Sequence, residues 1–147
     1  MKKIISHRGN LVGPNPELEN KPEYILSALD KNYDVEIDVW LVENKIYLGH
    51  DRPTYKVDIG FLKQKGLWCH AKNLEAFQYM IKNKIHCFWH ESDKCVLTSK
   101  GFLWCFPGVF LKNGITVVDG KQELEHEKEI LGVCTDHVLY YAESSRE

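Results

Sequence analysis

Short apolar runs alternate with helical or turn-rich segments along most of this chain of 147 residues. The clearest apolar runs lie at residues 2–6, 34–40, 67–71 and 86–89. Residues 21–32 and 74–83 instead carry apolar side chains at helical spacing. Because strands that alternate with helices are typical of parallel βα units, the pattern predicts an α/β fold.

The remaining segments and the chain length limit how such units can be arranged. Further strands are predicted at residues 102–106, 116–118 and 132–134, a charged helix at 121–130, and a turn or helix at 137–142. A complete eight-fold barrel typically needs about 250 residues. We therefore predict a single domain over residues 1–147, folded as a compact TIM-type (β/α) barrel with several shortened or missing helices. An open doubly wound sheet is the alternative.

Charge and cysteine content exclude several classes of protein. The formal net charge is −2, and no basic run is present, which argues against nucleic acid or a charged membrane surface as partner. No apolar segment is long enough for a membrane span or a signal peptide. The five cysteines form no CxxC pair, and four lie inside apolar runs. We expect free, buried thiols in a cytoplasmic protein.

An alternating acid pair lies in the strand predicted at 34–40. Glu36 and Asp38 are two residues apart, so their side chains project from one face, while Val35, Ile37 and Val39 project from the other. Two carboxylates held together repel unless a cation neutralises them. Carboxylate oxygens suit Mg²⁺ or Ca²⁺. The competing interpretation is the exposed face of an edge strand.

Two histidines follow predicted strands, where parallel α/β proteins place their catalytic groups. His7-Arg8-Gly9 follows the first strand, and Gly49-His50-Asp51 follows a hairpin strand at 46–48. Histidine exchanges protons near neutral pH, and the planar fork of arginine matches phosphate oxygens. Taken singly, a surface loop and a turn before a proline explain these residues as well.

The order of these motifs resembles that of a known family. The segments ISHRGN, PNPELENKPEYILSAL, YDVEIDVW and IYLGHDRP follow one another within residues 4–53. They resemble the His-Arg-Gly, Pro-Glu-Asn, Glu-x-Asp and His-Asp pattern of the glycerophosphodiester phosphodiesterases, which belong to the phosphatidylinositol phospholipase C-like phosphodiesterases. The Thr-Asp that follows residues 132–134 is similar to the end of that family's last strand.

The resemblance implies a metal-dependent phosphoric diester hydrolase of lipid metabolism. It implies that His7 and His50 are the general acid/base pair, that Arg8 holds the phosphate, and that Glu36 and Asp38 bind a divalent metal. In the family's reaction a substrate hydroxyl attacks the neighbouring phosphorus and expels an alcohol. The cyclic phosphate that results can then be hydrolysed.

The chain departs from the family at the third strand. Family members carry Glu-x-Lys there, whereas this sequence has His70 and Lys72. Lys72 fits a phosphate contact, and His70 is a candidate third metal ligand. Mg²⁺ or Ca²⁺ remains the expected metal, and a histidine ligand would also suit Mn²⁺ or Zn²⁺. The competing interpretation is a hydrogen-bonded barrel histidine that leaves the metal with two protein ligands. His90 and Trp104 are further candidates for the substrate pocket, with core packing as the competing interpretation of each.

Three functions therefore remain open at this point. The first is hydrolysis of a glycerophosphodiester or related small-molecule phosphodiester. The second is binding of a phosphate ester without turnover, since His70 replaces the glutamate and the family's insertion after the His-Asp motif is missing. The third is a lyase reaction that stops at the cyclic phosphate. The sequence leaves the substrate alcohols and the oligomeric state undetermined.

Overall fold

The computed structural model describes residues 2–145 as a succession of short strands and shorter helical segments. The strands are β1 (Lys3–His7), β2 (Asp34–Val42), β3 (Lys45–Leu48), β4 (Tyr55–Val57), β5 (Leu67–Ala71), β6 (Cys87–Phe88), β7 (Cys95–Leu97), β8 (Leu103–Cys105), β9 (Gly114–Val118) and β10 (Gly132–Thr135). The helices are α1 (Pro22–Asp30), α2 (Ile59–Leu62), α3 (Leu74–Lys82) and α4 (Val138–Ser144).

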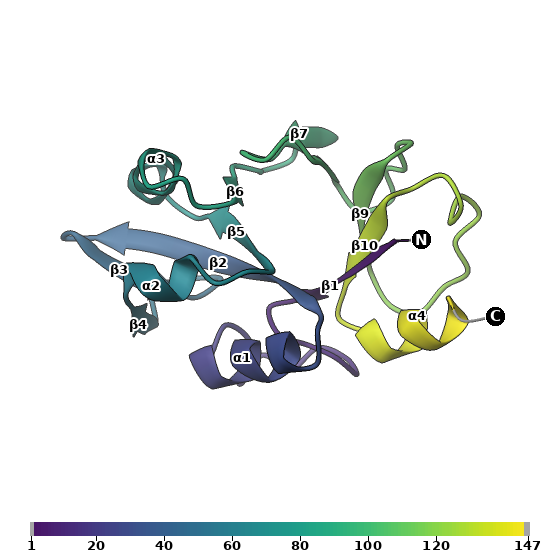
Figure 1. Cartoon of the computed structure of the whole chain (residues 1–147), viewed down its shortest axis with the longest axis horizontal. Coiled ribbons are helices and arrows are strands. Elements are labelled where there is room, and N and C mark those ends of the chain that lie inside the picture. The colour runs from purple at the N-terminus through teal and green to yellow at the C-terminus, as the bar shows by residue number, and fades with distance from the viewer. Residues whose placement is uncertain (1, 146–147) are drawn as a thin grey trace.

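All of these strands belong to one curled, mixed sheet (Figure 1). The main path runs β4-β3-β2-β1-β10-β9-β8-β7, and β5 pairs with both β2 and β6. The pairs β1–β2, β1–β10, β2–β5, β5–β6, β9–β10 and β8–β9 are parallel. The pairs β2–β3, β3–β4 and β7–β8 are antiparallel. Strand β1 therefore lies in the middle of the sheet, and its carboxyl end lies beside that of β10.

The predicted TIM-type (β/α) barrel is wrong. Within residues 2–145 no strand ladder joins β6 to β7 or β8, so the sheet forms a curled half-barrel and does not close. Helices make up only about 20% of the chain, and they do not alternate regularly with the strands. The physical reason is that the chain is too short for a helix after every strand. Loops replace the helical crossovers between β8, β9 and β10, and the antiparallel pairs are joined by short turns.

The charged helix predicted at 121–130 is also wrong, because this segment forms turns. Only Leu124 and Ile130 are apolar among its residues, so a helix here would have no continuous apolar face to bury against the sheet. Ile130 nevertheless packs into the core beside Val133 and Tyr141. Burial of single side chains thus anchors the loop without a helix.

Most other predicted elements are confirmed to within a few residues. β5 and α3 begin where the sequence placed them, and the closing segment forms α4. Helix α1 begins at Pro22, a position where the missing N–H of proline costs no helical hydrogen bond. The elements β4, α2 and β7 were missed, because three or four residues are too few to show a period.

The two faces of the sheet bury different side chains. On the outer face Val35, Ile37 and Val39 of β2 pack in one core with Ile25 of α1 and Met80 of α3. The inner face buries a mostly aromatic cluster of Ile5, Trp68, Phe88, Trp104, Ile115 and Cys134. In β2, the residues between Val35, Ile37 and Val39 therefore project towards the inner face. These include Glu36 and Asp38, which lie on one face as predicted and are almost fully buried.

None of the helices between residues 2 and 145 has the length and apolar character that crossing a bilayer requires. The five cysteines are free, and all but Cys95 are buried, which confirms the expected free thiols.

Candidate functional site

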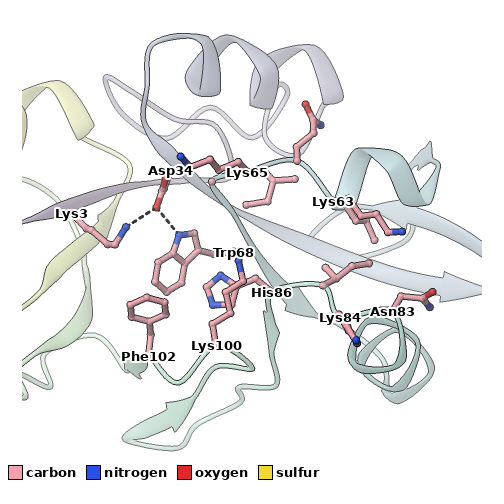
Figure 2. A pocket seen from close by; sticks show the side chains of 15 residues that line it. Lys3, Asp34, Lys63, Lys65, Trp68, Asn83, Lys84, His86, Lys100 and Phe102 are labelled. Carbon is pink, nitrogen blue, oxygen red and sulfur yellow. Dashed lines mark hydrogen bonds and ion pairs between the residues drawn. The ribbon is translucent and has the colours of Figure 1, made fainter.

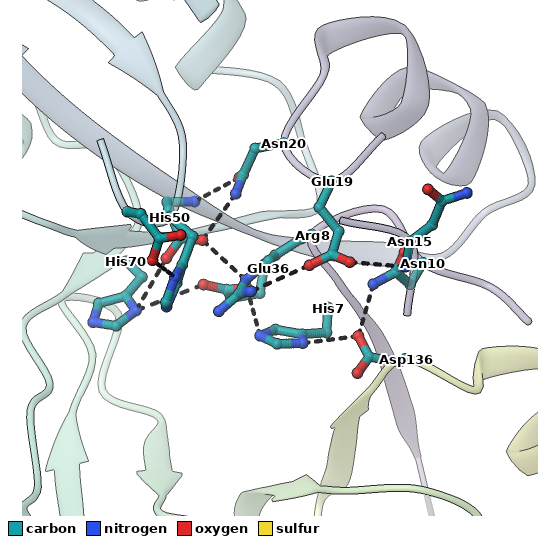
Figure 3. A network of polar contacts seen from close by, with 12 residues as sticks. His7, Arg8, Asn10, Asn15, Glu19, Asn20, Glu36, His50, His70 and Asp136 are labelled. Atoms are coloured by element: carbon teal, nitrogen blue, oxygen red, sulfur yellow. Dashed lines mark hydrogen bonds and ion pairs between the residues drawn. The ribbon is translucent and has the colours of Figure 1, made fainter. Parts of the chain in front are cut away.

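Several of the side chains predicted for chemistry gather where the carboxyl ends of β1 and β5 flank the first half of β2 (Figure 3). The sheet register explains this. His7 is the neighbour of Glu36 across the β1–β2 pair, and Asp38 is the neighbour of His70 across the β2–β5 pair. Since parallel strands run in the same direction, side chains from three strands that are far apart in the sequence reach one place.

Glu36, Asp38 and His70 form a compact group with the spacing of a metal site. One ligand atom from each lies within 4.8 Å of the others. The Nδ1 atom of His70 is 3.4 Å from Asp38 Oδ1 and 3.7 Å from Glu36 Oε1. The Nε2 atom of His70 is 2.9 Å from the carbonyl oxygen of His90, to which it donates a hydrogen bond. This bond fixes the ring so that Nδ1 faces the carboxylates.

Two buried oxygen atoms of this group accept no hydrogen bond from any residue between 2 and 145. They are Oε2 of Glu36 and Oδ1 of Asp38. A buried carboxylate oxygen without a donor is costly, and a divalent cation removes that cost. The oxygen-rich donor set and the two oxygens that lack a hydrogen bond therefore fit a divalent metal, with His70 Nδ1 as a third ligand.

Asn20 holds Asp38 in place from the loop before α1. Its side-chain nitrogen donates to Asp38 Oδ2 at 2.9 Å, and its side-chain oxygen accepts from the backbone nitrogen of Asp38 at 2.9 Å. Asn20 has a positive φ of 64°, a conformation that asparagine tolerates better than most residues. The amide therefore fixes both the backbone and the carboxylate of Asp38.

Neighbouring groups keep Asp38 and His70 ionised. Burial raises the pKa of Asp38, but His70, Arg8 and Asn20 outweigh this effect and hold the pKa well below its usual range. Burial lowers the pKa of His70, but the adjacent carboxylates of Asp38 and Glu36 raise it to about 9. Without a metal, His70 is therefore a cation at neutral pH and partly neutralises the two acids.

His7 is oriented by a chain of hydrogen bonds. Its Nδ1 atom lies 2.8 Å from Asp136 Oδ1, which also accepts from the side chain of Asn10 at 2.8 Å, and Asn10 accepts from the hydroxyl of Tyr24 at 3.0 Å. Its Nε2 atom faces Glu36 Oε2 at 3.7 Å. Burial lowers the pKa of His7, but the bond to Asp136 and the charge of Glu36 outweigh this and raise it above the usual value.

Arg8 connects the metal-site residues to the loop before α1. Its Nη1 atom donates to Glu19 Oε1 at 3.2 Å, and its Nε atom forms an ion pair with Asp38 Oδ2 at 3.1 Å. Arginine carries five N–H donors, so these two contacts leave others for an anionic ligand. The backbone conformation that places Arg8 here depends on a glycine at position 9. Arg8 and Gly9 both have positive φ, and a Cβ on Gly9 would collide with the ring of Tyr24.

His50 lies across a cavity from the strand-end residues. The cavity has a volume of about 390 Å³ and is lined by Arg8, Glu19, Asn20 and the loop 49–55. The ring of His50 is partly exposed, and its Nδ1 atom is 2.8 Å from Asp51 Oδ1. A hydrogen bond from Gly49 N to Asp38 O attaches this loop to β2. The two predicted catalytic histidines thus come from different elements: His7 from the end of β1, beside Glu36, and His50 from the loop that lines this cavity.

The remaining predicted substrate contacts lie farther from this centre. Lys72 follows β5, and its side chain makes no ion pair or hydrogen bond in the described part of the chain. His90 is half-buried and packs edge-on against Phe106, and neither of its ring nitrogens has a hydrogen-bond partner among the described residues. Trp104 is buried in the aromatic cluster of the inner face, 4.5 Å from the ring of Phe88. No contact tests their roles, so these remain predictions.

Sequence reasoning missed the residues that position the site. Asp136, Asn10 and Tyr24 were not among the predicted site residues, although all three complete the hydrogen-bond chain to His7. A signal for Asp136 was present, since it directly follows a predicted strand. No sequence pattern around Tyr24 indicates its role, because only the tertiary fold brings its partner, Asn10, within hydrogen-bond distance.

Comparison with known proteins adds nothing to this geometry. No known protein family, no curated protein sequence and no solved structure matched the chain.

Proposed function

We propose that the protein is a metal-dependent phosphodiesterase that acts on a glycerophosphodiester or a related small phosphodiester. The observation that carries this proposal is the metal-site group of Glu36, Asp38 and His70, two of whose buried oxygens accept no hydrogen bond within residues 2–145, lying directly beside His7 and Arg8. The reducing compartment suggested by five free thiols supports a cytoplasmic enzyme.

Glu36, Asp38 and His70 would hold the metal, with Mg²⁺ or Ca²⁺ favoured by the two carboxylates and Mn²⁺ or Zn²⁺ by the imidazole. When bound, the metal supplies positive charge for phosphoryl oxygens and for the attacking oxygen. Arg8 uses its free N–H groups to hold a phosphate oxygen. The cavity beside it accommodates one esterified group of the substrate.

The two histidines divide the proton transfers. The raised pKa of His7 keeps its ring protonated to a higher pH, which suits a donor to the leaving alcohol. Asp136 holds the proton on Nδ1, so Nε2 is the nitrogen that exchanges a proton with the substrate. His50 then accepts the proton of the attacking hydroxyl. Hydrolysis of a cyclic intermediate would reverse these two roles.

A second candidate is a phosphate-ester-binding protein without turnover. The specific observation is that protonated His70 already neutralises part of the acid pair. A metal must displace that proton, so metal affinity would increase with pH. If the site stays metal-free at neutral pH, Arg8 and His7 would still bind an anion.

The test is an assay of the purified chain against glycerophosphocholine and bis(p-nitrophenyl) phosphate with Mg²⁺, Ca²⁺, Mn²⁺ or Zn²⁺. We expect His7→Ala and His50→Ala each to reduce turnover about a hundredfold to ten-thousandfold. His126→Ala is the matched control, because that histidine is exposed in the 121–130 loop. Full activity in both site variants would overturn the assigned roles.

Phosphorus NMR of the products separates the remaining outcomes. A linear phosphomonoester identifies a hydrolase, and an accumulating cyclic phosphate identifies a lyase. Tight binding of the phosphodiester with no metal-stimulated turnover would establish the binding protein instead.

A further inference from the structure

A second cavity is lined by residues at the amino ends of β1, β2 and β5 (Figure 2). Its volume is about 500 Å³. Lys3 and Asp34 begin β1 and β2, Trp68 lies near the start of β5, and His86 and Phe102 immediately precede β6 and β8. The candidate site is built at the carboxyl ends of strands, so the two cavities are separate features of the fold.

The charge of this cavity contrasts with that of the whole chain. Five lysines line it (Lys3, Lys63, Lys65, Lys84 and Lys100), and Asp34 is the one acid among its lining residues. The chain as a whole has a formal net charge of −2. A concave surface with this excess of one sign concentrates the potential and attracts counter-ions.

The single acid, Asp34, is already paired with Lys3, so it does not neutralise the charge of the other four lysines. Asp34 Oδ2 accepts hydrogen bonds from Lys3 Nζ at 3.4 Å and from Trp68 Nε1 at 3.0 Å. The other four lysines form no ion pair with any residue between 2 and 145, and their side chains are exposed. They come from three different segments: the loop before β5, the turn before β6 and the turn between β7 and β8.

The cavity floor is neutral and aromatic. His86 stacks obliquely on Trp68 at 4.4 Å and lies 2.9 Å from the hydroxyl of Thr98. Burial lowers the pKa of His86 to about 4, with the charge of Lys100 acting in the same direction. The cation excess therefore lies at the rim and comes from the lysines alone.

We propose that this cavity binds a small anion carrying several negative charges, of the oligophosphate class. One exposed lysine contributes little to the binding of one charge, so a monovalent anion would not be retained. An anion with several charges contacts lysines from different segments at once, and the volume is that of a small-molecule site. This proposal is independent of the phosphodiesterase proposal, since it uses none of the same residues.

The test is titration with inorganic pyrophosphate in metal-free buffer, followed by NMR of the histidine rings and of the Trp68 indole N–H. We expect saturable shifts at His86 and Trp68, a weaker response to inorganic phosphate, and weaker binding at higher salt. Shifts confined to His7 and His50 would place the anion at the candidate active site. That result would overturn the second site while leaving the proposed enzyme intact.

Matched charge variants complete the experiment. The double variant Lys84→Gln/Lys100→Gln should weaken pyrophosphate binding about threefold to thirtyfold. The control Lys45→Gln/Lys56→Gln removes the same charge from the exposed β3–β4 hairpin and should leave the affinity unchanged. Equal weakening by both pairs would show a general charge effect and would overturn the proposal, as would unchanged binding in the first pair.

Discussion

At the scale of single residues, the positioning of His7 depends on Asp136. The carboxylate accepts from His7 and from Asn10 and lies at the end of a different strand. Because it is ionised, it both fixes the ring and raises the pKa of His7. A neutral amide of the same shape would preserve packing while removing that charge.

We therefore expect Asp136→Asn to lower the pKa of His7 and to reduce phosphodiester turnover about tenfold to a hundredfold. Histidine NMR measures the pKa, and the pH–rate profile should shift its high-pH limb to lower pH. Glu129→Gln, at an exposed acid near His126, is the control. An unchanged His7 pKa in Asp136→Asn would contradict this assignment.

The side-chain amide of Asn20 and its positive φ both contribute to stability, and different substitutions test the two contributions separately. Asn20→Gly removes both bonds to Asp38 but tolerates the positive φ, and we expect it to lower the free energy of unfolding by about 1–3 kcal/mol. Asn20→Ala adds backbone strain and should be less stable still.

Urea unfolding of both variants measures these differences. Asn32→Gly is the control, since Asn32 is exposed and has a similar φ of 65°. Equal stability of Asn20→Gly and the wild-type chain would show that the Asp38 bonds contribute nothing.

At the scale of elements, the β3–β4 connection carries His50 and depends on one glycine. Gly49 has φ of 152°, and a Cβ there would collide with the backbone carbonyl of Arg52. Its own N–H bonds to Asp38 O, and its carbonyl accepts from Trp40. The loop that presents His50 is thus packed against β2 through backbone atoms.

We expect Gly49→Ala to displace the loop 49–54 and lower the unfolding free energy by about 1–3 kcal/mol. Amide exchange of the loop and urea unfolding check this result. Gly101→Ala is the control, because Gly101 also has a positive φ but has open space around its Cβ direction. Similar losses in both variants would assign the effect to backbone strain alone.

At the scale of the whole molecule, buried neutral His86 links stability to pH. Its folded pKa of about 4 lies below the ordinary value of 6.5, so between these values the unfolded chain binds more protons than the folded one. The stability contribution is complete above pH 6.5 and is lost as the pH falls towards 4. His7, whose pKa is raised, contributes in the opposite sense, with stability lost as the pH rises through its folded pKa.

His86→Gln should therefore reduce the loss of stability between pH 6.5 and pH 4. Urea unfolding at several pH values measures the slope, with His126→Ala as the exposed-histidine control. The same slope in His86→Gln and wild type would show that His86 is not the group responsible.

The sequence by itself determined the local features of this protein. Alternation in β2 placed Glu36 and Asp38 on one face, and helical spacing located α1 and α3. Both predictions rest on residue periodicities that repeat several times within a single strand or helix. Sequence position also placed His7 and His50 near strand ends: His7 is the last residue of β1, and His50 follows β3 by two residues.

Only the tertiary structure decided what those local features combine into. The strand order brought His70 beside Asp38 and Asp136 beside His7, across gaps of 32 and 129 residues that no local pattern encodes. It also left the sheet open where a barrel was predicted, since pairing between distant strands depends on how the whole chain packs. The lysine-lined cavity has the same origin, because its residues meet only at the amino ends of the folded sheet.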